Sequence, residues 1–166
     1  MTDTRPSSTP SSTPKSAPRS TAASANLLAS ATTLLPHPLP PCENARIALF
    51  AMRRMGAHGL ADARASHTMF TAFGQSFRRP LVLLRALMAD LAGTSAGTIA
   101  IAPCCCARMT PAESAMLSIL ARVEIAPESA RYLMADLLGV RRVDGVLASA
   151  AAVAAAFADE GRPVTM

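Results

Sequence analysis

From Cys42 onward, apolar residues recur at intervals of three and four positions, and this helical period constrains the fold more than any other feature of the chain. Proline and glycine divide the pattern into segments of helical length, and Gly139 is expected to end the helix that starts near Pro127. The sequence predicts helices over residues 43–59, 60–74 and 80–92, followed by further helices that begin near Thr110, Pro127 and Val143. The extended stretch 98–102 has no visible partner strand. We therefore expect an all-α protein, a compact bundle of five or six helices.

Local signals mark several helix ends. Thr110 and Glu113 have the spacing of a capping box, with Pro111 at the first helical position between them. Pro80 prefers a first helical position for the same reason, so residues 74–79 are expected to be a break. The first helix is apolar around most of its circumference, which is typical of a central helix. The second helix is expected to bury Ala65, Met69, Phe70 and Phe73.

The first 41 residues have a different composition from the rest. Ser, Thr, Pro and Ala dominate residues 1–25, where apolar side chains are too few to offset the entropy of ordering the backbone. We expect residues 1–41 to be a disordered tail that ends in an extended lead-in at 34–41, and residues 42–166 to form a single helical domain. The basic, acid-poor tail also has the composition of an organellar transit peptide, and an extension from an early start codon is a third interpretation.

Charge and motifs narrow the classes of function. The net charge is +5, and fifteen of the sixteen basic residues are arginine, spread along the chain. With no Trp and one Tyr, the chain has few aromatic platforms for stacking bases, which counts against a nucleic-acid binder. No stretch reaches the roughly 18 apolar residues that cross a bilayer, so no membrane role is expected. The common hydrolase, nucleotide and zinc-protease motifs are missing from the sequence, which favours a non-enzyme.

The most distinctive motif is the run Cys104-Cys105-Cys106. If the extended geometry of 98–102 continues through it, Cys105 faces inward while Cys104 and Cys106 share an outer side. Those thiolates would suit Zn or Cu(I) if the fold brings Cys42, His58 or His67 close enough to complete the ligand set. Alternatively, the nearby helix start and Arg108 would make Cys106 a reactive, redox-sensing thiol. We favour a third interpretation, packing of small apolar side chains in a turn, because adjacent cysteines do not match established ligand spacing.

Four arginines are candidates for binding an anion. Arg54 shares a helical stripe with His58, and a buried arginine there would need a partner such as Asp62 or Asp90. A structural ion pair is the interpretation that we favour, and a polar pocket for an anion is the alternative. The other candidates are Arg78 and Arg79, which precede a predicted helix N-terminus, and Arg108 beside the cysteines.

Three stretches carry a resemblance to a known family: residues 45–62, the Arg78-Arg79-Pro80-Leu81 helix, and the Pro103-Cys104-Cys105-Cys106 turn followed by Arg108-Met109-Thr110. Over about residues 36–163 the chain resembles a small uncharacterised family of alphaproteobacterial proteins, known as a domain of unknown function. The resemblance implies a bacterial, cytoplasmic protein and argues against a transit peptide. It supplies no catalytic residues.

We therefore expect a cytoplasmic, non-enzymatic regulatory or binding protein whose site combines Arg54, His58 and the cysteine turn. Its partner is a protein or a small anion. A thiolate soft-metal binder or thiol redox sensor is the first alternative. A nucleic-acid-associated factor is the second.

Overall fold

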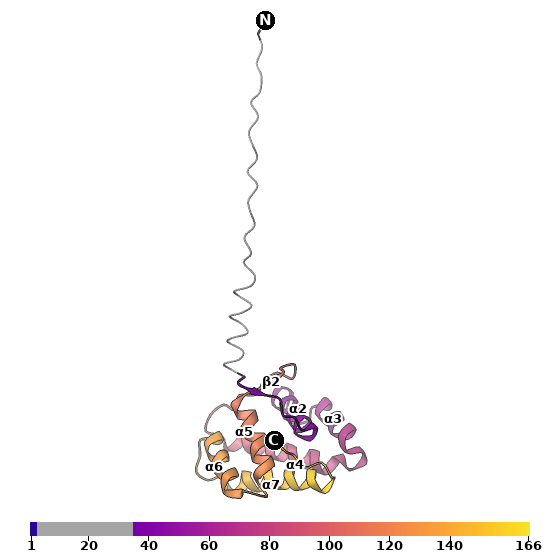
Figure 1. Cartoon of the computed structure of the whole chain (residues 1–166), viewed down its shortest axis with the longest axis vertical. Helices are drawn as coiled ribbons and strands as arrows, with labels where there is room; N and C mark the ends of the chain where they lie inside the picture. The colour runs from indigo at the N-terminus through magenta and orange to yellow at the C-terminus, as the bar shows by residue number, and fades with distance from the viewer. Residues whose placement is uncertain (3–34) are drawn as a thin grey trace.

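The computed structural model describes residues 1–2 and 35–166, and almost all of its regular structure is helical. The helices are α2 (Glu43–His58), α3 (Ala63–Phe73), the 3₁₀ helix η1 (Gly74–Phe77), α4 (Arg78–Thr94), α5 (Pro111–Arg122), α6 (Pro127–Leu138) and α7 (Asp144–Asp159). Within the described ranges the strands are β1 (His37–Pro38) and β2 (Arg108–Met109), which pair antiparallel (Figure 1). The predicted all-α class is confirmed. The part of the predicted tail at residues 3–34 lies outside the described residues.

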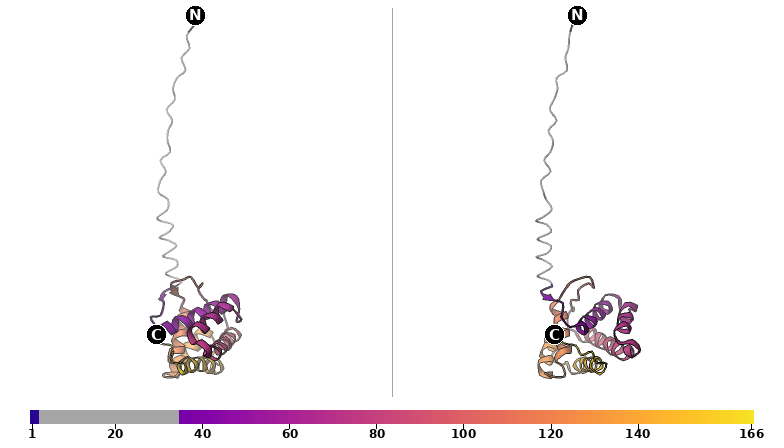
Figure 2. Two further views of the ribbon diagram at one scale, coloured as in Figure 1. Left: turned by 90° about the vertical axis from the view of Figure 1, so that its right-hand side faces the viewer. Right: turned by 45° about the vertical axis from the view of Figure 1, so that its right-hand side comes forward.

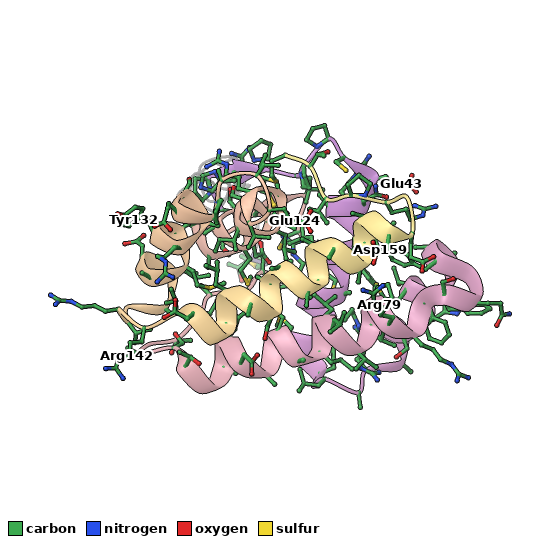
Figure 3. All side chains as sticks on the ribbon, turned by 90° about the horizontal axis from the view of Figure 1, so that it is seen from below. Glu43, Arg79, Glu124, Tyr132, Arg142 and Asp159 are labelled. Carbon is green, nitrogen blue, oxygen red and sulfur yellow. The ribbon has the colours of Figure 1, made fainter. Side chains whose placement is uncertain are left out.

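The core forms where α2 meets α3, α4 and α5, and where α7 lies along α4 (Figure 3). The α7 helix and the β1–β2 pair lie at opposite ends of this assembly (Figure 1, Figure 2). As predicted for a central helix, α2 contributes many buried residues, including Leu49, Met52 and Met55, each at most 2% exposed. None of the helices in the described ranges combines the length and apolar character that a bilayer span requires.

Two predicted helix ends are confirmed, the start of α5 and the end of α6, and Asp62 provides a cap at the start of α3 that was not predicted. The Thr110–Glu113 capping box is present, with Pro111 at the start of α5. Asp62 caps α3 by accepting a hydrogen bond from the Ala65 amide at 2.8 Å. Gly139 ends α6 with a φ of 66°, a left-handed conformation that glycine adopts without steric cost.

Two details of the predicted helices are wrong. The expected break at residues 74–79 is the 3₁₀ helix η1, and α4 begins at Arg78, two positions before Pro80. Pro80 still lies in the first turn of α4, where its missing N–H has no intrahelical partner to lose. Phe70 was expected to be buried but is 43% exposed, because it lies against the Phe77 ring at the edge of the bundle, with centroids 5.4 Å apart.

The lead-in belongs to the folded part of the chain. Strand β1 pairs with β2, so His37 lies opposite Met109 and Pro38 opposite Arg108. The Arg108 guanidinium donates to the carbonyls of Leu35, at 2.6 Å, and Pro36. His37 and Pro38 are thus extended, as predicted for the lead-in, but residues 35–38 contact the helical domain that was expected to start at residue 42.

Candidate functional site

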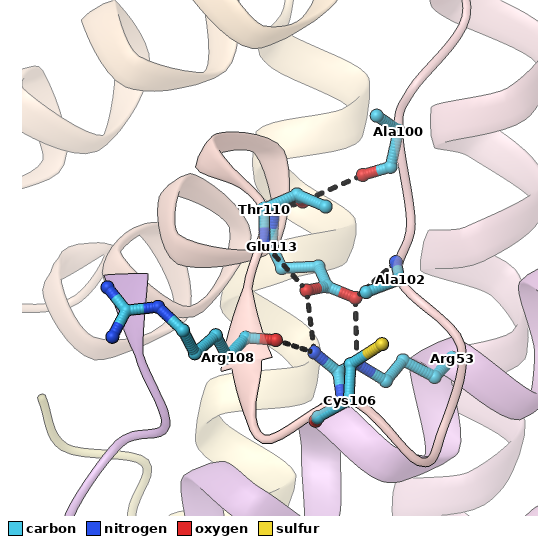
Figure 4. Close-up of polar contacts among 7 residues, drawn as sticks. All are labelled: Arg53, Ala100, Ala102, Cys106, Arg108, Thr110 and Glu113. Atoms are coloured by element: carbon cyan, nitrogen blue, oxygen red, sulfur yellow. Dashed lines mark hydrogen bonds and ion pairs between the residues drawn. The ribbon is translucent and has the colours of Figure 1, made fainter. Parts of the chain in front are cut away.

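A buried ion pair joins α2 to α5 and organises the surroundings of the cysteines (Figure 4). Arg53 is 3% exposed and Glu113 is fully buried. Arg53 Nε donates to Glu113 Oε1 at 2.8 Å, and Nη2 donates to Oε2 at 2.9 Å. This hydrogen-bonded carboxylate raises the pKa of Arg53 above its ordinary value, against the opposing effect of burial.

The same two side chains hold the backbone of residues 98–110, which we call the cysteine loop. The Glu113 carboxylate accepts from the amides of Ala102 and Thr110, both at 2.9 Å. Arg53 donates to the carbonyls of Cys106 at 2.8 Å and Arg108 at 2.7 Å. Buried charges are tolerated when hydrogen bonds satisfy their remaining polar atoms, and here the partners are the loop's own backbone groups. The ion pair therefore fixes the loop at four points.

Arg53 and Glu113 were not predicted as part of a site. The available signal was the position of Glu113, which lies three and four residues before the buried Met116 and Leu117 and so shares their face of α5. A glutamate on the buried face of a helix requires a cationic or donor partner. Its partner is 60 residues away in sequence, which the spacing of residues in α5 does not reveal.

The three cysteines lie in a turn and do not continue the extended stretch. The Cys106 amide donates to the Pro103 carbonyl at 3.0 Å, which closes the turn. Cys105 is exposed, whereas Cys104 and Cys106 are half-buried. The predicted alternation, with Cys105 inward, is wrong because the turn at Pro103 ends the extended geometry on which it depended.

Cys106 is also not the activated thiol that was predicted. Burial, followed by the neighbouring Cys105 side chain, raises its pKa, although Arg53 opposes this effect. The Arg108 guanidinium binds the lead-in carbonyls and points away from Cys106 (Figure 4). The thiol with a lowered pKa is Cys42, where burial raises the pKa but hydrogen bonds, first from the Thr165 side chain, outweigh it.

The candidate metal ligands are only partly brought together. Cys104, Cys105 and Cys106 share the turn, and the exposed His58 at the end of α2 lines the same recess as Cys104. Among residues 1–2 and 35–166, no group of three or more His, Cys, Asp or Glu side chains is arranged to hold a metal ion. The Zn or Cu(I) hypothesis stays a prediction.

A recess of about 530 Å³ lies between the C-terminal end of α2 and the cysteine loop. Its polar lining consists of Arg54, His58, Thr98 and Cys104. The remaining lining residues are glycine, alanine, isoleucine and proline from α2 and residues 99–103. The recess therefore combines an apolar wall with a small number of polar groups, the usual character of a small-molecule site.

Arg54 forms the predicted ion pair with Asp62. Its Nε and Nη2 donate to the two carboxylate oxygens at 3.1 and 2.7 Å, and the side chains are 14% and 8% exposed. The alternative partner, Asp90, instead accepts from Ser149 at 2.5 Å. The hydrogen bonds that Arg54 donates to Asp62 raise the pKa of Arg54, and the Cys104 thiol adds to the effect. Asp62 uses two of the three guanidinium nitrogens, which leaves Nη1 for another acceptor.

The replacement Arg54→Gln is expected to raise the pKa of Asp62 from about 2 toward its ordinary value of 3.8, because the hydrogen bond from Arg54 is the main cause of the lowering. A lowered carboxyl pKa stabilises the fold at neutral pH, and this stabilisation is lost as the pH falls from 3.8 to about 2. Carboxyl-carbon NMR titration measures the shift. The exposed Arg64→Gln serves as the control, and an unchanged Asp62 titration in Arg54→Gln would show that the pair is not formed.

The other candidate anion-binding arginines lie apart from this recess. Arg79 is paired with Asp159 at 2.6 Å, with both side chains more than half exposed (Figure 3). Arg78 is exposed at the start of α4, and Arg108 binds the lead-in. The described structure therefore does not gather Arg54, Arg78, Arg79 and Arg108 into one anion site.

Comparison with known proteins identifies a family for most of the described domain. A family model described as a family of unknown function, DUF6628, matches residues 27–127, about three fifths of the chain. The matched region includes the Arg53–Glu113 pair, the cysteine loop and the recess, whereas α6 and α7 begin at or after its end. No curated protein and no solved structure matches the chain.

Proposed function

The chain belongs to DUF6628, a family of unknown function, and we propose that it is a non-enzymatic protein that binds a small molecule carrying a carboxylate. The observation that carries the proposal is the recess that places Arg54, His58 and Cys104 around an apolar wall. Its volume of about 530 Å³ lies within the usual range for small-molecule sites, roughly 300–1,000 Å³.

The charge of the recess favours a single negative charge on the ligand. Asp62 already neutralises much of the charge on Arg54, so a doubly charged phosphate would meet little compensation. A carboxylate requires one or two donors, and Nη1 of Arg54 together with the exposed His58 imidazole can supply them.

The buried Arg53–Glu113 pair holds one wall of the recess in place, which supports binding by a preformed site. The loop that forms one wall is held at Ala102, Cys106, Arg108 and Thr110 by the buried ion pair. A wall fixed before the ligand arrives reduces the ordering cost of binding. The four cysteines are free thiols, as expected in a reducing compartment, and the cytoplasm is the location that we propose.

Amide NMR titration with butanoate tests the proposal. Binding is expected to shift the amides of residues 56–58 and 98–104, and Arg54→Gln is expected to weaken it about tenfold or more, the usual effect of losing a hydrogen bond to a charged group. Asp62→Asn should act in the opposite direction, because it removes the charge that neutralises Arg54 and frees Nη2, while the asparagine Oδ1 still caps α3. Arg64→Gln is the control. Equal affinity in the Arg54 and Asp62 variants, or shifts located elsewhere, would contradict the proposal.

A further inference from the structure

A second cavity, of about 350 Å³, adjoins the recess along residues 99–101. Ser95 contributes its one polar side chain, and the rest of its lining is apolar, with Met55, Met88 and Met116 as the largest flexible side chains. Methionine adapts its shape to what it contacts, so this cavity suits a flexible apolar group. We call it the methionine groove.

The recess and the methionine groove share three lining residues, Gly56, Ile99 and Ile101. At this boundary the cysteine loop packs closely on α2. A Cβ atom on Gly56 would lie 2.7 Å from Ile101 Cδ1, so the absence of a side chain on Gly56 lets Ile101 lie directly on α2. Glycine within a helix lowers stability by about 0.5–1 kcal/mol relative to alanine. At position 56, glycine allows the close contact with Ile101 that a larger residue would prevent. The boundary between the charged recess and the apolar groove is therefore formed by Ile99 and Ile101, with Ile101 lying directly on Gly56.

We propose that the ligand is amphipathic, a medium-chain fatty carboxylate whose head group binds at Arg54 and whose chain passes Ile101 into the methionine groove. This inference rests on the proposed function, since it takes the head-group site from it. The charged groups lie at one end, at Arg54 and His58, whereas apolar residues line the recess wall and almost all of the methionine groove, which is the distribution of such a ligand. The chain contributes affinity through burial of methylene groups, and the head group sets the orientation.

Carboxylates of different acyl chain length distinguish the amphipathic ligand from the simple carboxylate site. Octanoate is expected to bind about tenfold more tightly than butanoate, which corresponds to burying about half of its additional methylene surface. In protein labelled with ¹³C-methyl methionine, octanoate should shift the methyl signals of Met55, Met88 and Met116, while butanoate should not. Met69 and Met134 do not line either cavity and serve as internal controls.

A substitution at an exposed position tests the groove without disturbing the core. Ala92 is exposed and lines the groove, so Ala92→Phe should fill it and reduce octanoate affinity to that of butanoate. Ala86→Phe, also exposed on α4 but outside both cavities, should leave the preference unchanged.

The outcomes are distinct. Suppose that the two acids bind with equal affinity, that binding depends on Arg54, and that the methyl signals of Met55, Met88 and Met116 do not shift. This result would overturn the amphipathic ligand but not the proposed carboxylate site. Binding of neither acid would overturn both proposals. Shifts of Met69 and Met134 as large as those of Met88 would show nonspecific adsorption and would also overturn this inference.

Discussion

Glu113→Gln is expected to lower the free energy of unfolding by about 3–5 kcal/mol, the typical cost of removing one partner of a buried ion pair. The substitution leaves the Arg53 charge without a counter-ion in a site that is 3% exposed. It also places an NH2 group where either the Ala102 amide or the Thr110 amide now finds an acceptor, so one of the two loses its hydrogen bond. Chemical denaturation followed by circular dichroism measures the loss. Glu124→Gln, on an exposed glutamate, should change stability by no more than about 0.5 kcal/mol.

The double variant Arg53→Met, Glu113→Met distinguishes this pair from an isolated salt bridge. Buried ion pairs can often be replaced by apolar residues with little loss, because both desolvation costs disappear together. Here the pair also satisfies two amides and two carbonyls of the cysteine loop. The double variant should therefore remain destabilised, and hydrogen exchange at Ala102 and Thr110 should accelerate more than in the helices. Full recovery of stability, or unchanged exchange at these amides, would contradict the role assigned to the pair.

The features that sequence reasoning predicted well are those encoded within a few residues. The Thr110-Pro111 start of α5 and the Gly139 end of α6 depend on local backbone chemistry, and both are confirmed. The Arg54–Asp62 pair could also be predicted, because its members are eight positions apart and only a short turn between α2 and α3 lies between them.

The features that sequence reasoning missed depend on contacts between segments that are distant in the chain. Arg53 lies next to Arg54 in α2 but faces the cysteine loop, whose position over α2 is not encoded in the helical period. The orientation of Cys105 depends on the turn that Pro103 starts, so the alternation inferred from residues 98–102 does not extend to it. Both misses concern the same loop, and the buried pair that holds it is the contact that local patterns could not reveal.

Phe157→Ala is expected to lower the free energy of unfolding by about 3–5 kcal/mol, the range for deleting a buried aromatic side chain. Phe157 is fully buried in α7 and packs edge-on against Phe73, with ring centroids 4.9 Å apart. Its neighbours in α7 include the small residues Val153, Ala154 and Ala156, which have little side chain with which to fill the space that the ring leaves.

Phe70→Ala provides a matched control, because it removes the same ring from another edge-on pair. Phe70 is 43% exposed and lies 5.4 Å from Phe77, so its loss should cost about 1 kcal/mol or less. Both rings occur at helical spacing among apolar residues. Both variants lose the same side chain, so a difference between their free energies of unfolding under identical conditions reports the difference in burial of the two rings. Similar losses would show that Phe70 is covered in solution, whereas a loss below about 2 kcal/mol for Phe157→Ala would show that the packing around Phe157 is looser than the structure describes.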